Sequence, residues 1–179
     1  MTIPNRPTDQ NALPPAGEVP TIPTTFTRFR LAFYTRPIGI FGWLTKLFTG
    51  TPVHVELVFN DFLIYSAATK ADGSVGTRFK IQQGFPPPNW LFVELDPKYA
   101  SAAFQFAYTE QGDPYDYWGL LFGWSYNYRP SPTRWYCSEV VSAALMFAGI
   151  PLKSQSPQYY TARRLYLELT TPAPKALVT

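Results

Sequence analysis

The chain contains one cysteine and one histidine, and each lies where its local sequence could make it reactive. Cys137 begins an apolar segment, 137–148, that has the pattern of a buried helix. The N–H groups and the dipole at a helix N-terminus stabilise a thiolate, which lowers the pKa of a thiol placed there. His54 lies in a strand-like segment, 53–59, and a neighbouring imidazole would complete an activated nucleophile. If the two side chains meet, they form the nucleophile and base of a cysteine hydrolase or acyltransferase.

Both residues also have a structural interpretation. A lone cysteine is more often a small buried apolar residue than a nucleophile, and His54 could be a core histidine with its hydrogen bonds satisfied. The polar residues Ser138 and Glu139, which follow Cys137 directly, favour the nucleophile. Glu139 itself is interpreted as structural, because its carboxylate complements the helix dipole but would raise the pKa of a nearby thiol. Neither a metal nor a cofactor is expected, because the chain has no ligand cluster and no nucleotide-binding motif.

Alternating apolar residues predict the sheet that would carry His54. In the segment 53–59 every second residue from Val53 is apolar, so His54 and Glu56 share the opposite face. Further strands are predicted at 29–34, 62–67, 77–82 and 90–95, and helices at 38–48, after Asp96-Pro97, at 117–124, at 137–148 and after Ser156-Pro157. These elements indicate an α+β fold, with one antiparallel sheet packed by helices.

Proline content divides the chain into three parts. Residues 1–25 are rich in proline and poor in apolar residues, which predicts an extended arm. Such an arm is either disordered or docked, and a protein partner for it is one expectation. Residues 26–168 form the expected domain, since a length of 179 residues suits one domain, and residues 169–179 form a C-terminal tail.

The composition argues against several classes of protein. The net charge of +3 is mild and the basic residues are scattered, so nucleic acid is not an expected partner. The apolar runs are far shorter than the roughly 20 residues that span a bilayer, so no membrane span is expected. No secretory signal is evident after Met1, and we therefore expect a cytoplasmic or virion-associated protein without a signal peptide.

Four sequence pieces occur in a characteristic order: TPVHVEL (51–57), YSAA (65–68) with a downstream glycine, GDPYDYWGLLFGW (112–124) and WYCSEVVSAALMFAGI (135–150). Together they resemble the circularly permuted NlpC/P60 papain-like cysteine hydrolases, especially their YiiX-like branch. Lecithin retinol acyltransferase-like proteins are more distantly similar. In ordinary NlpC/P60 domains the nucleophilic cysteine precedes its histidine, whereas in the permuted group the histidine strand comes first, as it does here. The resemblance covers about residues 26–168.

The resemblance implies a circularly permuted papain-like fold in which Cys137 is the nucleophile and His54 the general base. The family orients this histidine with a third polar residue on the next strand, and Ser66 stands at the matching position. Serine cannot offset the imidazolium charge that forms during the reaction. Glu56, on the same strand face as His54, is therefore the alternative orienting residue.

The implied activity is that of a cysteine peptidase or amidase, a thiol hydrolase of peptide, isopeptide or peptidoglycan-stem bonds. It would proceed through an acyl-enzyme on Cys137, with Tyr136 on the oxyanion side and Tyr117 lining the substrate cleft. Two alternatives remain open. One is a catalytically weak or inactive structural or assembly protein of a larger particle, such as a phage virion, that keeps this fold. The other is a lipid acyltransferase.

Overall fold

The computed structural model describes residues 25–37, 39–69, 75–82, 84–122, 131 and 133–171. Except for Thr25, the proline-rich arm expected at 1–25 lies outside these residues, as does the expected tail from residue 172 onwards. The last described helix continues to Thr170, past the domain boundary expected at 168.

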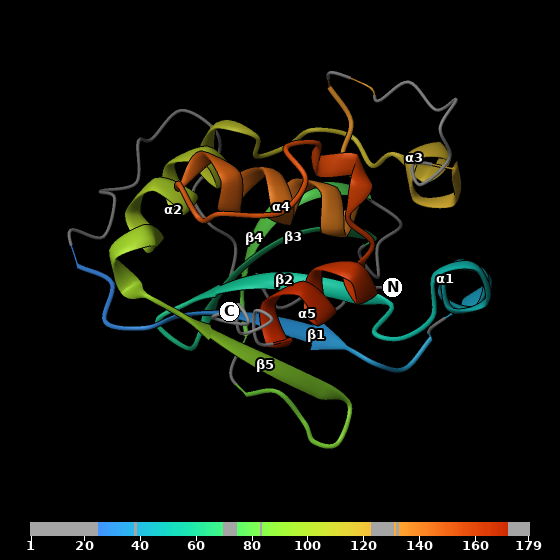
Figure 1. Cartoon of the computed structure of the whole chain (residues 1–179), viewed down its shortest axis with the longest axis horizontal. Coiled ribbons are helices and arrows are strands. Elements are labelled where there is room, and N and C mark those ends of the chain that lie inside the picture. The colour runs from blue at the N-terminus through green and yellow to red at the C-terminus, as the bar shows by residue number, and fades with distance from the viewer. Residues whose placement is uncertain are drawn as a thin grey trace, which may run out of the picture.

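Five antiparallel strands form one sheet in the order β4-β3-β2-β1-β5 (Figure 1). Their bounds are β1 Phe29–Tyr34, β2 His54–Phe59, β3 Leu63–Thr69, β4 Val75–Ile81 and β5 Trp90–Leu95. The antiparallel sheet and the α+β class are thus confirmed, with strand ends that differ by up to two residues from the predicted ones. The apolar alternation succeeded because one face of β1, β2 and β3 lies in the main core.

The helices occur where caps and breakers predicted them. Their bounds are α1 Gly39–Thr49, the 3₁₀ turn η1 Pro97–Tyr99, α2 Ala100–Thr109, α3 Tyr117–Phe122, α4 Cys137–Phe147, the 3₁₀ turn η2 Pro157–Tyr159 and α5 Ala162–Thr170. The Asp96 side chain accepts a hydrogen bond from the Lys98 N–H and so starts η1. Thr161 caps α5 in the same way, through the Arg164 N–H.

Helix α4 is the central packing element, and it explains how Cys137 reaches the sheet. The helix lies against β2 and β3, with α2 beside it (Figure 1). Val140, Val141, Ala144 and Leu145 of α4 are fully buried in the main core. Because the helix is buried along nearly its whole length, its first residue is held close to the start of β2.

The turn after α2 is pinned to the edge strand β4, and it carries the chain towards Tyr115. The Thr77 N–H donates to the Asp113 carbonyl at 2.9 Å, and the Gly112 N–H donates to the Thr77 carbonyl at 3.0 Å. Gly76, with φ of +142°, allows this approach, because a Cβ there would lie 2.4 Å from the Asp113 carbonyl oxygen. A glycine is therefore required where the turn meets β4.

Replacing Gly76 with alanine should lower the free energy of unfolding by about 3 kcal/mol, because it adds a backbone clash to an unfavourable φ. Urea denaturation measures this change. Gly84→Ala is the matched control: φ is +82° there, but a Cβ would meet no atom within 4 Å, so the loss should be only about 1 kcal/mol. Equal losses for the two variants would contradict the packing role of Gly76.

Candidate active site

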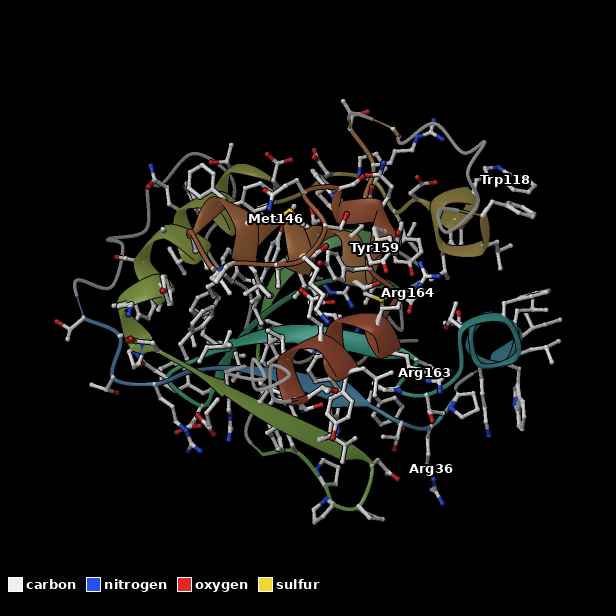
Figure 2. All side chains as sticks on the ribbon, in the orientation of Figure 1. Arg36, Trp118, Met146, Tyr159, Arg163 and Arg164 are labelled. Atoms are coloured by element: carbon white, nitrogen blue, oxygen red, sulfur yellow. The ribbon has the colours of Figure 1, made fainter. Side chains whose placement is uncertain are left out.

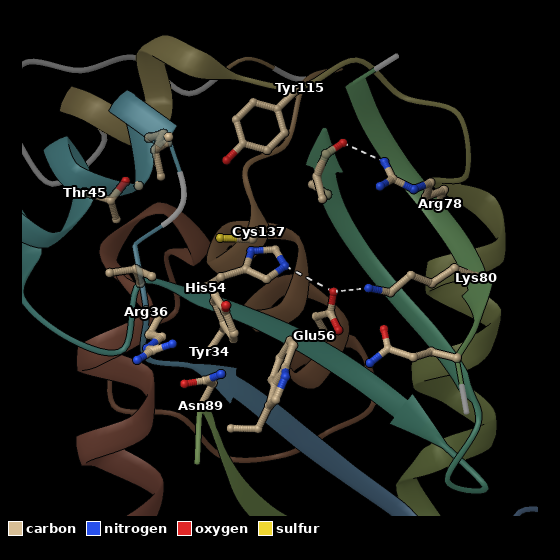
Figure 3. A pocket seen from close by; sticks show the side chains of 18 of the residues that line it. Tyr34, Arg36, Thr45, His54, Glu56, Arg78, Lys80, Asn89, Tyr115 and Cys137 are labelled. Carbon is tan, nitrogen blue, oxygen red and sulfur yellow. Dashed lines mark hydrogen bonds and ion pairs between the residues drawn. The ribbon is translucent and has the colours of Figure 1, made fainter. Parts of the chain in front are cut away.

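The structure brings Cys137 and His54 together. Cys137 is the first residue of α4, and His54 is the first residue of β2. Cys137 is 2% exposed, and its thiol is a hydrogen-bond partner of the imidazole, which lies beside it in Figure 3. The two residues come from segments far apart in the sequence, and the packing of α4 on β2 joins them.

The Cys137–His54 pair favours the charged forms of both groups. Burial raises the pKa of Cys137, but the His54 charge and the N–H groups of Val55 and Ser138 outweigh it, so the pKa of the thiol falls below its ordinary value. Burial lowers the pKa of His54, yet the Cys137 thiolate and Glu56 raise it to about 10. Each charge supports the other, which is the arrangement of a thiolate–imidazolium pair.

Glu56 supplies a buried negative charge to the imidazole. Its Oε1 lies 3.2 Å from His54 Nε2 and 2.7 Å from Lys80 Nζ, as the dashed lines in Figure 3 show. The Glu56 side chain is only 2% exposed, and burial raises the pKa of this carboxyl, but His54 and Lys80 together lower it below the ordinary value. Glu56 therefore stays ionised although it is buried.

Ser66, the other residue expected to orient His54, contacts the same ring nitrogen. Its Oγ lies 3.4 Å from His54 Nε2 and donates to the Val55 carbonyl at 3.1 Å. With its proton on that carbonyl, the Ser66 oxygen is left to accept from the imidazole. The structure thus brings both expected partners to His54, with Glu56 at the shorter distance and carrying the charge.

Lys80 is a member of the site that the sequence did not indicate. It lies on β4, where it pairs with Ile64 of β3 and shares a sheet face with Glu56. Arg78 and Lys80 alternate with apolar residues along β4, and this pattern indicates that the strand has a polar face. Its meaning depends on the register of three strands, and local spacing does not specify that register.

Tyr115 is the second residue that sequence reasoning did not select. Its hydroxyl points into the cleft towards Cys137 (Figure 3). Burial and the nearby Cys137 charge raise the pKa of Tyr115 well above its ordinary value, so the hydroxyl stays protonated and can donate a hydrogen bond. A parallel β-bridge to Trp135, the residue two before Cys137, holds Tyr115 in place.

An open cleft of about 700 Å³ lies over the pair. Tyr117 lines it, as expected, and its ring centroid lies 4.9 Å from that of Tyr115. Tyr136 does not line this cleft: it is buried behind Cys137, and its hydroxyl donates to the Gln158 carbonyl at 2.8 Å. The remaining walls come from α1, β3, β4 and the segment before β5, through residues that include Ile40, Thr45, Ala68, Arg78 and Asn89.

Glu139 lies in the first turn of α4 and is buried, as is its neighbour Asp116. Burial, followed by the Asp116 charge, raises the pKa of Glu139 to about 8. At neutral pH this carboxyl is therefore mostly protonated. It does not place the negative charge beside Cys137 that its sequence position suggested.

Within the described residues, no group of three or more His, Cys, Asp or Glu side chains could hold a metal ion. None of the described helices is both long enough and apolar enough to cross a membrane. Comparisons of the chain with protein-family models, with curated proteins and with solved structures gave no match. The geometry of Cys137, His54 and Glu56 is thus the basis on which a function can be argued.

Proposed function

We propose that the protein is a thiol hydrolase that cleaves amide bonds through an acyl-enzyme on Cys137, within a circularly permuted papain-like (NlpC/P60) fold. The observation that carries this proposal is the contact between Cys137 at the start of α4 and His54 at the start of β2, on the floor of an open cleft. A histidine strand upstream of the cysteine helix is consistent with the permuted order.

In the proposed reaction the Cys137 thiolate attacks the carbonyl carbon of the scissile amide. The tetrahedral intermediate collapses as the imidazolium of His54 gives its proton to the leaving amine. A thioester then joins the acyl group to Cys137. Water, deprotonated by His54, attacks this thioester, and the acid product leaves as the thiolate–imidazolium pair is restored.

Two donors are placed to stabilise the oxyanion. The backbone N–H of Cys137 is at the N-terminus of α4, where no side chain of the preceding Tyr136 caps the helix. The protonated hydroxyl of Tyr115 points towards the same sulfur (Figure 3). Donors that are fixed before the reaction stabilise the developing charge without reorganisation. The hydroxyl of Tyr115 thus takes the part that the sequence suggested for Tyr136.

The proposed substrates are peptides, isopeptides or peptidoglycan stem peptides, and the proposed location is the cytoplasm or a virion. A cleft of about 700 Å³ is of the size that holds a ligand of a few residues. The competing proposal of an inactive assembly protein requires the thiol to be chemically ordinary. The two proposals therefore differ in the expected reactivity of the thiol. Substrate hydrolysis and alkylation of Cys137 both measure this reactivity.

Replacing Cys137 with alanine should abolish hydrolysis of muropeptides and N-acyl amino acids, with a loss of at least ~10³-fold, because it removes the chain's one thiol, on which the acyl-enzyme forms. Release of the free amine measures turnover, and circular dichroism checks that the variant folds. Thr133→Ala, in the exposed segment before α4, is the control and should keep full activity. Equal turnover by Cys137→Ala and the wild type would refute the proposal.

Alkylation of Cys137 should reach half its maximal rate at a pH below the value of about 8.5 that is typical of a free thiol, because the pKa of the thiol is lowered. The alkylation rate is measured with iodoacetamide across a pH series. His54→Gln removes the opposing charge, so its profile should move to higher pH. Because Cys137 is the chain's one cysteine, Cys137→Ala is the blank. A wild-type midpoint at or above the free-thiol value would favour the assembly protein.

Replacing Lys80 with methionine should lower kcat/KM by about 10-fold and move the acid limb of its pH profile to higher pH. Without the ammonium, the pKa of buried Glu56 rises. The carboxyl then stays neutral to higher pH and supports the imidazolium less. Lys98→Met, at an exposed ion pair with Asp96, is the matched control and should leave the profile unchanged. A loss of activity with an unshifted profile would assign Lys80 a purely structural role.

A further inference from the structure

Six large apolar side chains stand out from two adjacent helices, and we call this surface the apolar shelf. They are 47% to 76% exposed and comprise Ile40, Trp43, Leu47 and Phe48 of α1 with Trp118 and Phe122 of α3. The two helices contact each other and lie side by side at one edge of the molecule (Figure 1). Single exposed apolar residues are ordinary, but a contiguous group of this size marks an interaction surface.

Three basic residues lie beside the α1 part of the apolar shelf. Arg36, Lys46 and Arg163 are exposed, and none of the three forms a salt bridge with a described residue. Lys46 lies on α1 itself, and the Arg163 side chain lies against Gly50 at the end of that helix. Figure 2 shows Arg36 and Arg163 on the α1 side of the molecule.

At the opposite end of the sheet, basic residues are paired with carboxylates. The exposed carboxylates Asp61 and Glu94 lie near the Phe29 end of β1 and pair with Arg28. Neither α1 nor α3 contains an acidic residue. The basic residues beside the apolar shelf thus have no carboxylate partner among the described residues, and their charge can attract an anionic surface.

We propose that the apolar shelf docks the protein on the surface of an anionic lipid bilayer. Tryptophan, phenylalanine and leucine flanked by lysine and arginine are the side chains that interfacial helices insert among lipid headgroups. A symmetric dimer through the same surface is less suitable, because it would bring Arg36, Lys46 and Arg163 of two copies together.

Docking would also place the cleft at the bilayer. Ile40 belongs to the apolar shelf and Arg36 lies beside it, and both residues also line the cleft. The cleft therefore opens next to the docked surface. Docking on a bilayer decides where the protein is located in the cell or particle and not which reaction it catalyses. It does not depend on which bond Cys137 cleaves, and it can be tested with the inactive Cys137→Ala chain.

The test is sedimentation of the full chain with vesicles of phosphatidylcholine alone and with vesicles that also contain phosphatidylglycerol. Binding should be strong only with the anionic vesicles and should weaken as salt is added. Replacing Trp43 and Leu47 together with serine should lower the partition coefficient by about 10-fold or more. Replacing Lys46 and Arg163 with glutamine should remove the preference for anionic vesicles.

Phe62→Ser is the matched control, because Phe62 is an exposed aromatic residue in the β2–β3 turn, at the other end of the sheet. It should bind vesicles as the wild type does. The proposal is overturned if the wild type does not sediment with anionic vesicles, or if the Trp43/Leu47 variant binds like the control. It is also overturned if light scattering finds a dimer that this variant dissociates, since the apolar shelf would then join two copies.

Discussion

The buried carboxylate of Glu56 is the charge on which the candidate site depends. Removing a carboxylate from water is costly unless cations and hydrogen bonds replace the lost hydration. Here His54 and Lys80 both approach one oxygen of Glu56, from two different strands. The same charge favours the imidazolium, and the imidazolium favours the thiolate of Cys137. One carboxylate thus links β2, β4 and α4 electrostatically.

The fold makes this linkage possible by separating its two sheet faces. Val55, Leu57 and Tyr65 face α4 and form the main core, while Glu56 and Ser66 lie on the other face. His54 is the first residue of β2, the middle strand, at the end of that strand that meets the first residue of α4. A histidine further along the strand would be buried under the helix or turned away from its first residue.

Much of the fold could be predicted from the sequence, because apolar alternation and helix caps are local signals. The strands, the α4 helix and the ends marked by Asp96 and Gly149 follow from neighbouring residues alone. The contact between Cys137 and His54 could only be expected from the order of the motifs. The family relationship and the papain-like fold remain proposals.

The missing parts of the site required long-range register. Lys80 reaches Glu56 across β3, and this contact depends on the pairing of Ile64 with Lys80. Tyr115 is positioned by a bridge to Trp135, which joins two loops rather than two strands. Distances and burial decide whether Glu56 or Ser66 is the main partner of His54, and residue spacing in the sequence does not predict either quantity. Sequence patterns predict elements well, but they do not specify which side chains meet across them.

Glu139 gives the nucleophile's helix a pH-dependent stability of its own. Between the ordinary pKa of 4.5 and the value of about 8 in the fold, the unfolded chain carries this carboxyl ionised while the folded protein keeps it protonated. Each increase in pH within that window therefore favours unfolding at this residue. The helix that begins with Cys137 therefore becomes less stable as the pH rises towards about 8, because its buried Glu139 must then either stay protonated or carry a charge out of water.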